Sequence, residues 1–73
     1  MQQLTEAVNQ FARTQLSTTN NPQQLYDQLL KAVEQPYIQA MLKEFHGNQS
    51  QCAIALGLNR ATLRTKMRRY DLL

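Results

Sequence analysis

The chain has 73 residues, a net charge of +3 and 42% hydrophobic residues. This length allows one domain at most, and a globule of this size buries only about 60% of its unfolded surface. Its single cysteine, Cys52, excludes an intramolecular disulfide, and together with the lone His46 it cannot form a four-ligand zinc site. The sequence contains neither a long apolar run nor the layout of a signal peptide, which predicts a cytoplasmic protein without a membrane partner.

The first predicted element is a helix over roughly residues 3–17. Its apolar residues follow the spacing of a single helical stripe, and they are Leu4, Ala7, Val8, Phe11, Ala12 and Leu16. The polar run that follows predicts a loop at 18–21, and Pro22 suits the first turn of a second helix.

The segment 22–45 predicts a longer second helix with apolar residues on most of its sides. One stripe consists of Leu25, Leu29, Val33, Pro36 and Ala40, and the other of Tyr26, Leu30, Val33, Tyr37, Met41 and Phe45. Such a helix would span about 36 Å, whereas a compact globule of this chain length measures only about 29 Å across. We therefore expect a second copy of the chain to cover it, in an intertwined homodimer through the first two helices.

Pro36 is expected to kink or split this second helix, because proline deletes one hydrogen bond and clashes with the preceding turn. The alternative to the dimer is a three- or four-helix monomer in which the second helix is broken.

Residues 47–73 predict a helix-turn-helix. Gly47 ends the second helix, and Asn48 caps a short helix that runs to residue 56. Gly57 supplies a left-handed turn, and Asn59 caps a last helix that runs to residue 70. Ala53 allows the two short helices to cross closely. The inward positions are Cys52, Leu56, Leu58, Leu63 and Met67. Similar helix pairs also occur in proteins that bind nothing, so the spacing alone leaves the function open.

The charge on the last helix favours a nucleic-acid contact. Residues 59–73 have a net charge of +4, whereas residues 1–58 have a net charge of −1. The basic residues of the last segment are Arg60, Arg64, Lys66, Arg68 and Arg69. Ala61 and Thr65 at the centre of the outward face would let the helix approach a groove, while the long cations reach bases and phosphates. A solvated surface helix would be expected to mix acidic residues among the basic ones, but none occurs from 59 to 70. Double-stranded DNA is therefore the predicted partner.

These elements predict an all-α fold with four helices per subunit. Residues 1–46 form the dimerisation helices and residues 47–73 the DNA-binding segment, within one compact domain. The only glycines are Gly47 and Gly57, so there is no glycine-rich phosphate loop, and the acidic residues are scattered. We therefore expect no enzyme activity, no cofactor, no metal and no small-molecule substrate.

Three stretches resemble Fis, the family of bacterial nucleoid-associated factors for inversion stimulation. They read Ala-Val-Glu-Gln-Pro-Tyr at 32–37, Gly-Asn-Gln-Ser at 47–50 and Leu-Asn-Arg-Ala-Thr-Leu-Arg-Thr-Lys at 58–66. The resemblance implies a four-helix subunit that dimerises through its first two helices. It also implies a nucleoid protein that bends and compacts DNA with loose sequence preference and regulates transcription. The DNA-contacting residues that it implies are Asn48, Ser50, Asn59, Arg60, Thr62, Arg64 and Lys66.

Two departures from the family pattern limit what the resemblance implies. Thr65 stands where the family usually has a lysine directed at phosphate. The β-hairpin arm of family members that stimulate site-specific inversion has no counterpart ahead of the first helix, so recombinase stimulation is not expected.

Two other interpretations of the sequence stay open. The last third also resembles the DNA-binding domains of NtrC-type, sigma-54-dependent activators, although the segment 34–36 and the start at Met1 favour the free-standing Fis form. The chain could instead be a helical interaction module whose basic tail docks on an acidic partner or an anionic membrane. That tail would need a wide apolar face, which the last helix lacks.

Overall fold

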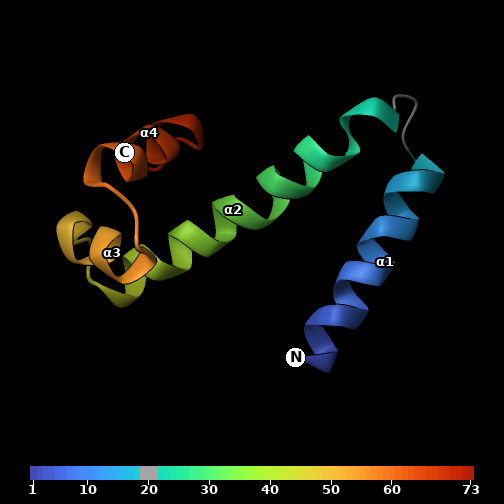
Figure 1. The fold of residues 1–73 in the computed structure, drawn as a ribbon, viewed down its shortest axis with the longest axis horizontal. Coiled ribbons are helices and arrows are strands. Elements are labelled where there is room, and N and C mark those ends of the chain that lie inside the picture. Colours follow the sequence, from blue (N-terminus) through green and yellow to red (C-terminus); the bar gives the residue numbers. More distant parts are fainter. Residues whose placement is uncertain (19–21) are drawn as a thin grey trace.

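The computed structural model describes residues 1–18 and 22–73, and every regular element in these ranges is helical (Figure 1). The elements are α1 (Gln2–Thr18), a short 3-10 turn η1 (Pro22–Gln24), α2 (Leu25–Glu44), α3 (Gln49–Leu56) and α4 (Arg60–Arg69). The all-α fold with four α-helices is thus confirmed, and α1 agrees with its prediction to within one residue at each end. The loop predicted at 18–21 lies mostly outside the described residues, and Thr18 is the last residue of α1.

The chain is elongated rather than globular. α1 and α2 approach each other at one end and diverge into an open V, while α3 and α4 gather at the far end of α2 (Figure 1). The Cα radius of gyration is 14.4 Å, and the molecule measures 39 × 27 × 17 Å. A compact chain of this length would have a radius of gyration of about 11 Å. The long α2 therefore exceeds what one copy of the chain covers.

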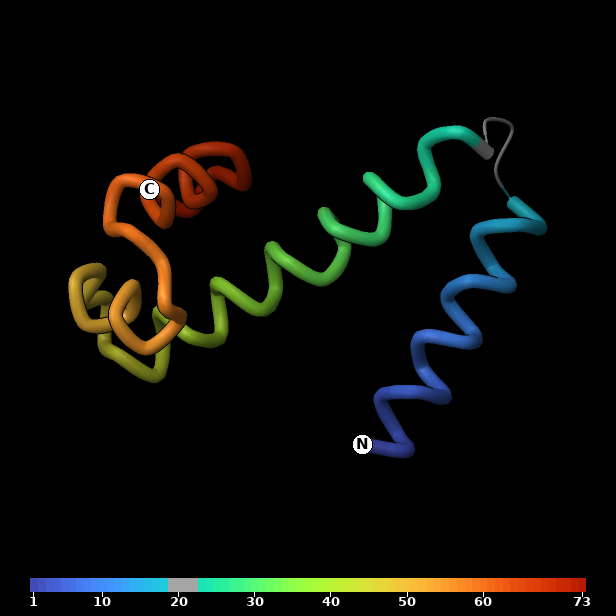
Figure 2. The backbone as a smooth tube through the Cα atoms, in the orientation of Figure 1, coloured from blue at the N-terminus to red at the C-terminus, as the bar shows by residue number. Residues whose placement is uncertain are grey.

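α2 passes through Pro36 as one continuous helix (Figure 2). Of the prediction that Pro36 kinks or splits this helix, the split is wrong, and so is the broken second helix that the monomer alternative assumed. Proline removes one backbone donor, but the turns on both sides keep their hydrogen bonds. The turn that follows the proline is also held by packing, because Ile38 lies in the core. The helix begins three residues later than predicted, since Pro22–Gln24 form a tighter 3-10 turn.

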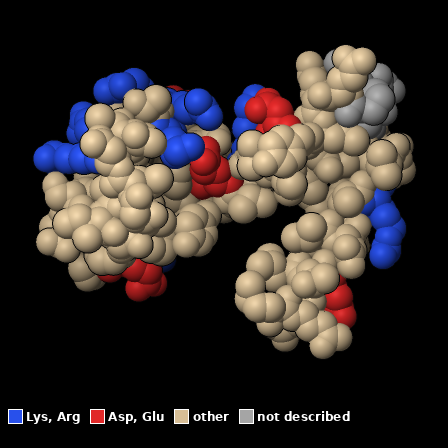
Figure 3. All heavy atoms as spheres, viewed as in Figure 1, with Lys and Arg blue, Asp and Glu red and all other residues tan. Residues whose placement is uncertain are grey.

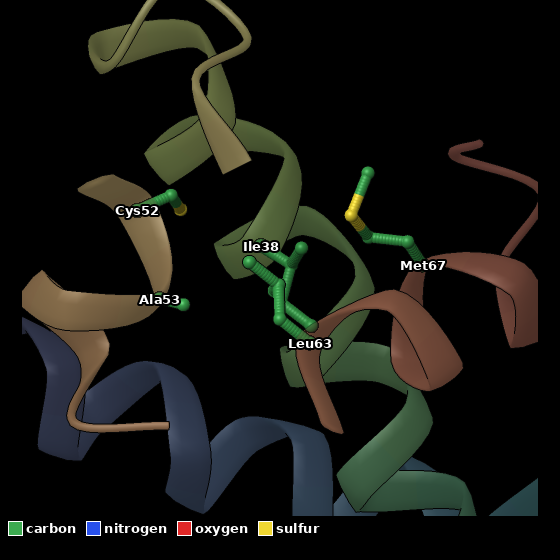
Figure 4. Packing of buried hydrophobic residues seen from close by; sticks show 5 residues of the cluster. All are labelled: Ile38, Cys52, Ala53, Leu63 and Met67. Carbon is green, nitrogen blue, oxygen red and sulfur yellow. The ribbon is translucent and has the colours of Figure 1, made fainter. Parts of the chain in front are cut away.

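The buried core lies between the C-terminal half of α2 and the helix-turn-helix. It consists of Ile38, Cys52, Ala53, Leu63 and Met67, and Figure 4 shows Ile38 of α2 meeting Leu63 of α4. Of the predicted inward positions, Cys52, Leu63 and Met67 are confirmed as buried, and Leu56 and Leu58 are half-buried. Ile38 belongs to neither predicted stripe of α2. The spacing of Ile38 with Met41, Leu42 and Phe45, which pack against the core, is nevertheless that of one helical face.

Backbone motifs of the same kind end α2, α3 and α4. In each, one amide bonds a carbonyl five residues back, from Gly47 to Leu42 at 2.8 Å, from Leu58 to Ala53 at 2.9 Å and from Leu72 to Met67 at 2.8 Å. The preceding residue is left-handed, with φ of 53° at His46, 71° at Gly57 and 57° at Asp71. This is the Schellman arrangement, which satisfies the last carbonyls of a helix. The sequence predicted Gly57 correctly, but at the end of α2 the left-handed position is taken first by His46 and then by Gly47.

Replacing Gly57 with alanine is expected to lower the free energy of unfolding by about 1 kcal/mol, because an L-residue is strained in the left-handed region. A Cβ atom at this position would meet nothing within 4 Å, so the loss does not come from a steric clash. Urea unfolding followed by circular dichroism measures it. Asparagine tolerates this region, so Gly57→Asn should lose less. Equal stability of the Gly57→Ala variant and the unaltered protein would contradict a left-handed turn.

Candidate functional site

α4 presents one apolar face to the core and one basic face to solvent. Leu63 and Met67 are buried and Tyr70 is half-buried, as the helical wheel predicts. The exposed residues of the helix are Arg60, Ala61, Thr62, Thr65, Arg68 and Arg69. Lys and Arg atoms gather over this end of the molecule (Figure 3). The surface is therefore built from small side chains surrounded by long cations, and it suits a polyanion. We call these six exposed residues the basic face.

Three of the residues implied by the family resemblance lie at helix N-termini. The Asn48 side chain accepts a hydrogen bond from the Gln51 amide at 3.1 Å, and that of Asn59 accepts one from the Ala61 amide at 2.7 Å. Ser50 is exposed in the first turn of α3. The first turn of a helix has amide donors without helical partners and a positive dipole end, so it attracts phosphate groups. Both asparagines thus cap their helices, as predicted.

Arg60 and Thr62 are exposed in the first turn of α4. A guanidinium at this place has its donors in a planar fork, which matches the acceptor pair on the edge of guanine. The hydroxyl group of Thr62 can both donate and accept a hydrogen bond. This end of α4 can therefore read a base edge if the helix enters a groove.

Arg64 lies between α4 and α3 rather than fully in solvent. Its Nη1 atom donates a hydrogen bond to Oε1 of Gln49 at 2.8 Å, and the pair is partly buried. This contact ties the middle of α4 to the first turn of α3. A guanidinium has five donors, so Arg64 keeps further donors for an anion.

Lys66 is held by an acidic residue of α2. Its Nζ atom lies 2.7 Å from Oε2 of Glu34, and the Tyr70 hydroxyl donates to Oε1 of the same carboxylate at 2.6 Å. The hydrogen bonds from Lys66 and then Tyr70 hold the pKa of the Glu34 carboxyl below its ordinary value. The bond to Glu34 in turn raises the pKa of the Tyr70 phenol. We call these three residues the Glu34 clamp.

The structure therefore divides the seven candidate residues into two groups. Asn48, Ser50, Asn59, Arg60 and Thr62 are exposed, whereas Arg64 and Lys66 are half-buried and bonded to other helices. Sequence reasoning missed Glu34 and Gln49 as the partners of these two cations. Glu34 is 32 residues from Lys66, and no helical spacing connects positions so far apart.

A second surface lies between α1 and α2 and is apolar. It is an open groove of about 220 Å³, lined by Leu4, Ala7, Val8, Phe11, Leu29, Ala32 and Val33. α1 has no buried residue in a single copy of the chain. Val33 remains 54% exposed, and its neighbours Leu30 and Tyr37 are exposed to a similar degree. Exposed apolar surfaces of this kind are typical of interaction sites.

Neither a cluster of metal-ligating side chains nor a membrane-spanning helix is found among the described residues. Within residues 1–18 and 22–73, no group of three or more His, Cys, Asp or Glu side chains could hold a metal. None of the described helices is both long and apolar enough to cross a bilayer. Cys52 is fully buried, and burial raises the pKa of its thiol, so the thiolate form that would react or bind metal is disfavoured.

Comparison with known proteins gives consistent matches over most of the chain. Residues 29–70 match the family model described as "Bacterial regulatory protein, Fis family". The chain is 37% identical to the DNA-binding protein Fis of Aeromonas hydrophila subsp. hydrophila in an alignment of length 71 that covers 94% of this chain and 72% of that protein. It is 36% identical to the DNA-binding protein Fis of Buchnera aphidicola subsp. Acyrthosiphon pisum over 73 residues, covering 97% of this chain and 74% of the relative.

Proposed function

Since the chain belongs to the Fis family of bacterial regulatory proteins, we propose that it binds double-stranded DNA as a homodimer and bends it. The observation that carries this proposal is the basic face of α4, presented by a helix-turn-helix whose other side packs on a shared core. Relatives that share more than a third of its residues bear the name DNA-binding protein. We further propose that it acts in the cytoplasm, at the nucleoid, as a regulator of transcription and not as an enzyme.

In the proposed complex α4 lies in the major groove. The first turn of a recognition helix normally meets base edges, which assigns base contact to Arg60 together with Asn59 and Thr62. Asn48 and Ser50 would contact phosphate through the first turn of α3. Arg64 and Lys66 would approach the backbone from the sides of α4. Exposed Arg68 and Arg69 extend the same positive surface and are further candidates for phosphate contact.

The proposed dimer is supported by the apolar surface that one chain leaves open. The groove between α1 and α2 has leucine, valine and phenylalanine side chains along its walls. A second copy can cover this groove with the same residues, because a two-fold interface is self-complementary. Two copies would also present two α4 helices, and symmetric pairs of recognition helices read two half-sites on one duplex.

Replacing Arg60 with alanine tests the assignment of α4 to the major groove. The loss of one bidentate contact to guanine should weaken binding to a preferred duplex by about 1–3 kcal/mol per site and binding to a random duplex much less. Fluorescence anisotropy on one duplex selected from a randomised library and one scrambled duplex measures both affinities.

Arg13→Ala is the matched control for this experiment. Arg13 is also exposed, and its replacement also removes one positive charge, but it lies on α1. It should leave the ratio of the two affinities unchanged. If Arg60→Ala lowers both affinities in parallel, Arg60 only anchors phosphate. If neither duplex is bound by the unaltered protein, the proposed function is wrong.

A further inference from the structure

The Glu34 clamp joins the middle of the long helix to the helix that carries the basic face. Glu34 lies midway along α2, while its two partners lie one turn apart at the end of α4. Both carboxylate oxygens are used, Oε2 by Lys66 at 2.7 Å and Oε1 by Tyr70 at 2.6 Å. A two-point attachment of this kind restricts both the tilt of α4 and its rotation about its own axis, because hydrogen bonds are directional.

The Glu34 clamp is more buried than an ordinary surface ion pair. The side chains of Lys66 and Glu34 are 26% and 28% exposed, whereas those of the Lys31–Asp27 pair on α2 are 60% and 66% exposed. Exposed pairs contribute little to stability or geometry because water and salt compete with them. The half-buried clamp also receives a second hydrogen bond from a neutral hydroxyl, so its geometry is better defined.

Apolar packing alone would leave the orientation of α4 less restricted. Leu63 and Met67 of α4 pack against Ile38 of α2 in the core, but such contacts are non-directional. The remaining side-chain bond of α4 to another helix, Arg64 to Gln49, reaches α3 and not α2. Among the described contacts, the clamp is therefore the polar link between α4 and the helix that lines the groove with α1.

We propose that Glu34 is a positioning residue that sets the orientation of α4 relative to α2 through Lys66 and Tyr70. This inference rests on the proposed function. In the proposed dimer α2 belongs to the interface, since the adjacent Val33 lines the groove. The clamp then transmits the geometry of the dimer to each recognition helix. It acts on selectivity, because base contacts need a fixed helix orientation whereas phosphate contacts on random DNA tolerate a variable one.

The test compares three variants of the full chain on a duplex selected from a randomised library and on a scrambled duplex of the same composition. Glu34→Gln keeps the size of the side chain and removes the charge that holds Lys66. Tyr70→Phe removes one of the two hydrogen bonds without a change of net charge. Glu44→Gln is the matched control, since Glu44 is exposed on the same helix and lies outside the clamp.

We expect Glu34→Gln to lower the ratio of selected to scrambled affinity by about tenfold, of the order of one lost base contact. Its affinity for the scrambled duplex should rise, with a steeper dependence on salt, because Glu34 no longer neutralises the Lys66 ammonium that approaches phosphate. Tyr70→Phe should lower the same ratio by a smaller factor and leave the salt dependence unchanged. Glu44→Gln should raise both affinities equally through its charge and leave the ratio as it is.

An equal shift of the ratio in Glu34→Gln and Glu44→Gln would overturn the proposal, because charge alone would then explain the effect. Unchanged ratios in both clamp variants, with DNA still bound, would also overturn it and leave the proposed function intact. Failure of the unaltered chain to bind either duplex would reject the proposed function, and this inference with it. Thermal unfolding by circular dichroism identifies a variant that does not fold. If Glu34→Gln does not fold, the affinity ratio of Tyr70→Phe, which keeps the ion pair, tests the proposal.

Discussion

Replacing Val33 with aspartate is expected to separate the proposed dimer into monomers. Val33 lies on the wall of the apolar groove, and each dimer would place two new carboxylates in the proposed interface. If burying each carboxylate costs at least about 2 kcal/mol, the dissociation constant rises by about three orders of magnitude or more. Sedimentation equilibrium at micromolar concentration measures the change in mass.

Ile54→Asp is the control for this substitution. Ile54 is 71% exposed on α3, so the change introduces the same charge at an apolar surface position outside the groove. It should leave the association state as it is. A stable folded monomer of the unaltered chain at micromolar concentration would contradict the dimer. Equal dissociation by both variants would show that the dimer does not form through the groove.

Raising the salt concentration from 50 to 200 mM is expected to weaken DNA binding by about four orders of magnitude. Four cations of α4 are placed for phosphate contact, since Arg68 and Arg69 are exposed and Arg64 and Lys66 are half-buried. Two subunits would then neutralise about eight phosphates, which gives a slope of log affinity against log salt of about −7. Anisotropy titrations at four salt concentrations measure this slope.

Arg69→Ala should reduce the magnitude of this slope by about two, one contact for each subunit. Lys43→Ala, which removes an exposed charge from α2, should leave it unchanged. A flat response of the unaltered protein to salt would contradict binding through the basic face. Circular dichroism at the same salt concentrations verifies that the fold itself does not change.

Features that depend on residues near in sequence were predictable. The stripe of α1, the caps at Asn48 and Asn59 and the left-handed turn at Gly57 all follow from local spacing and local backbone chemistry. The inward face of α4 was also predicted, because Leu63 and Met67 recur at helical period. Such features are encoded within one or two turns, so they do not require knowledge of how the helices pack.

Features that depend on packing between distant segments were not predictable. Ile38 was left out of both predicted stripes although its spacing with Met41, Leu42 and Phe45 signals one helical face, and only its partners in α3 and α4 depend on packing. The bond of Lys66 to Glu34 requires α4 to return along α2, which no sequence spacing expresses. The continuity of α2 through Pro36 has the same origin, since the packing of Ile38 in the core stabilises the helix beside the lost hydrogen bond. His46 and Asp71 adopt left-handed angles that local preference assigns first to glycine.

The unequal distribution of buried residues along the chain determines how assembly of the proposed dimer depends on concentration. The five buried core residues fall between positions 38 and 67, while α1 buries nothing within one copy. In the proposed dimer, α1 is covered only when two chains meet. At low abundance the amount of assembled protein then grows with the square of the number of chains synthesised. A twofold change in synthesis would thus alter the occupancy of weak chromosomal sites by up to about fourfold.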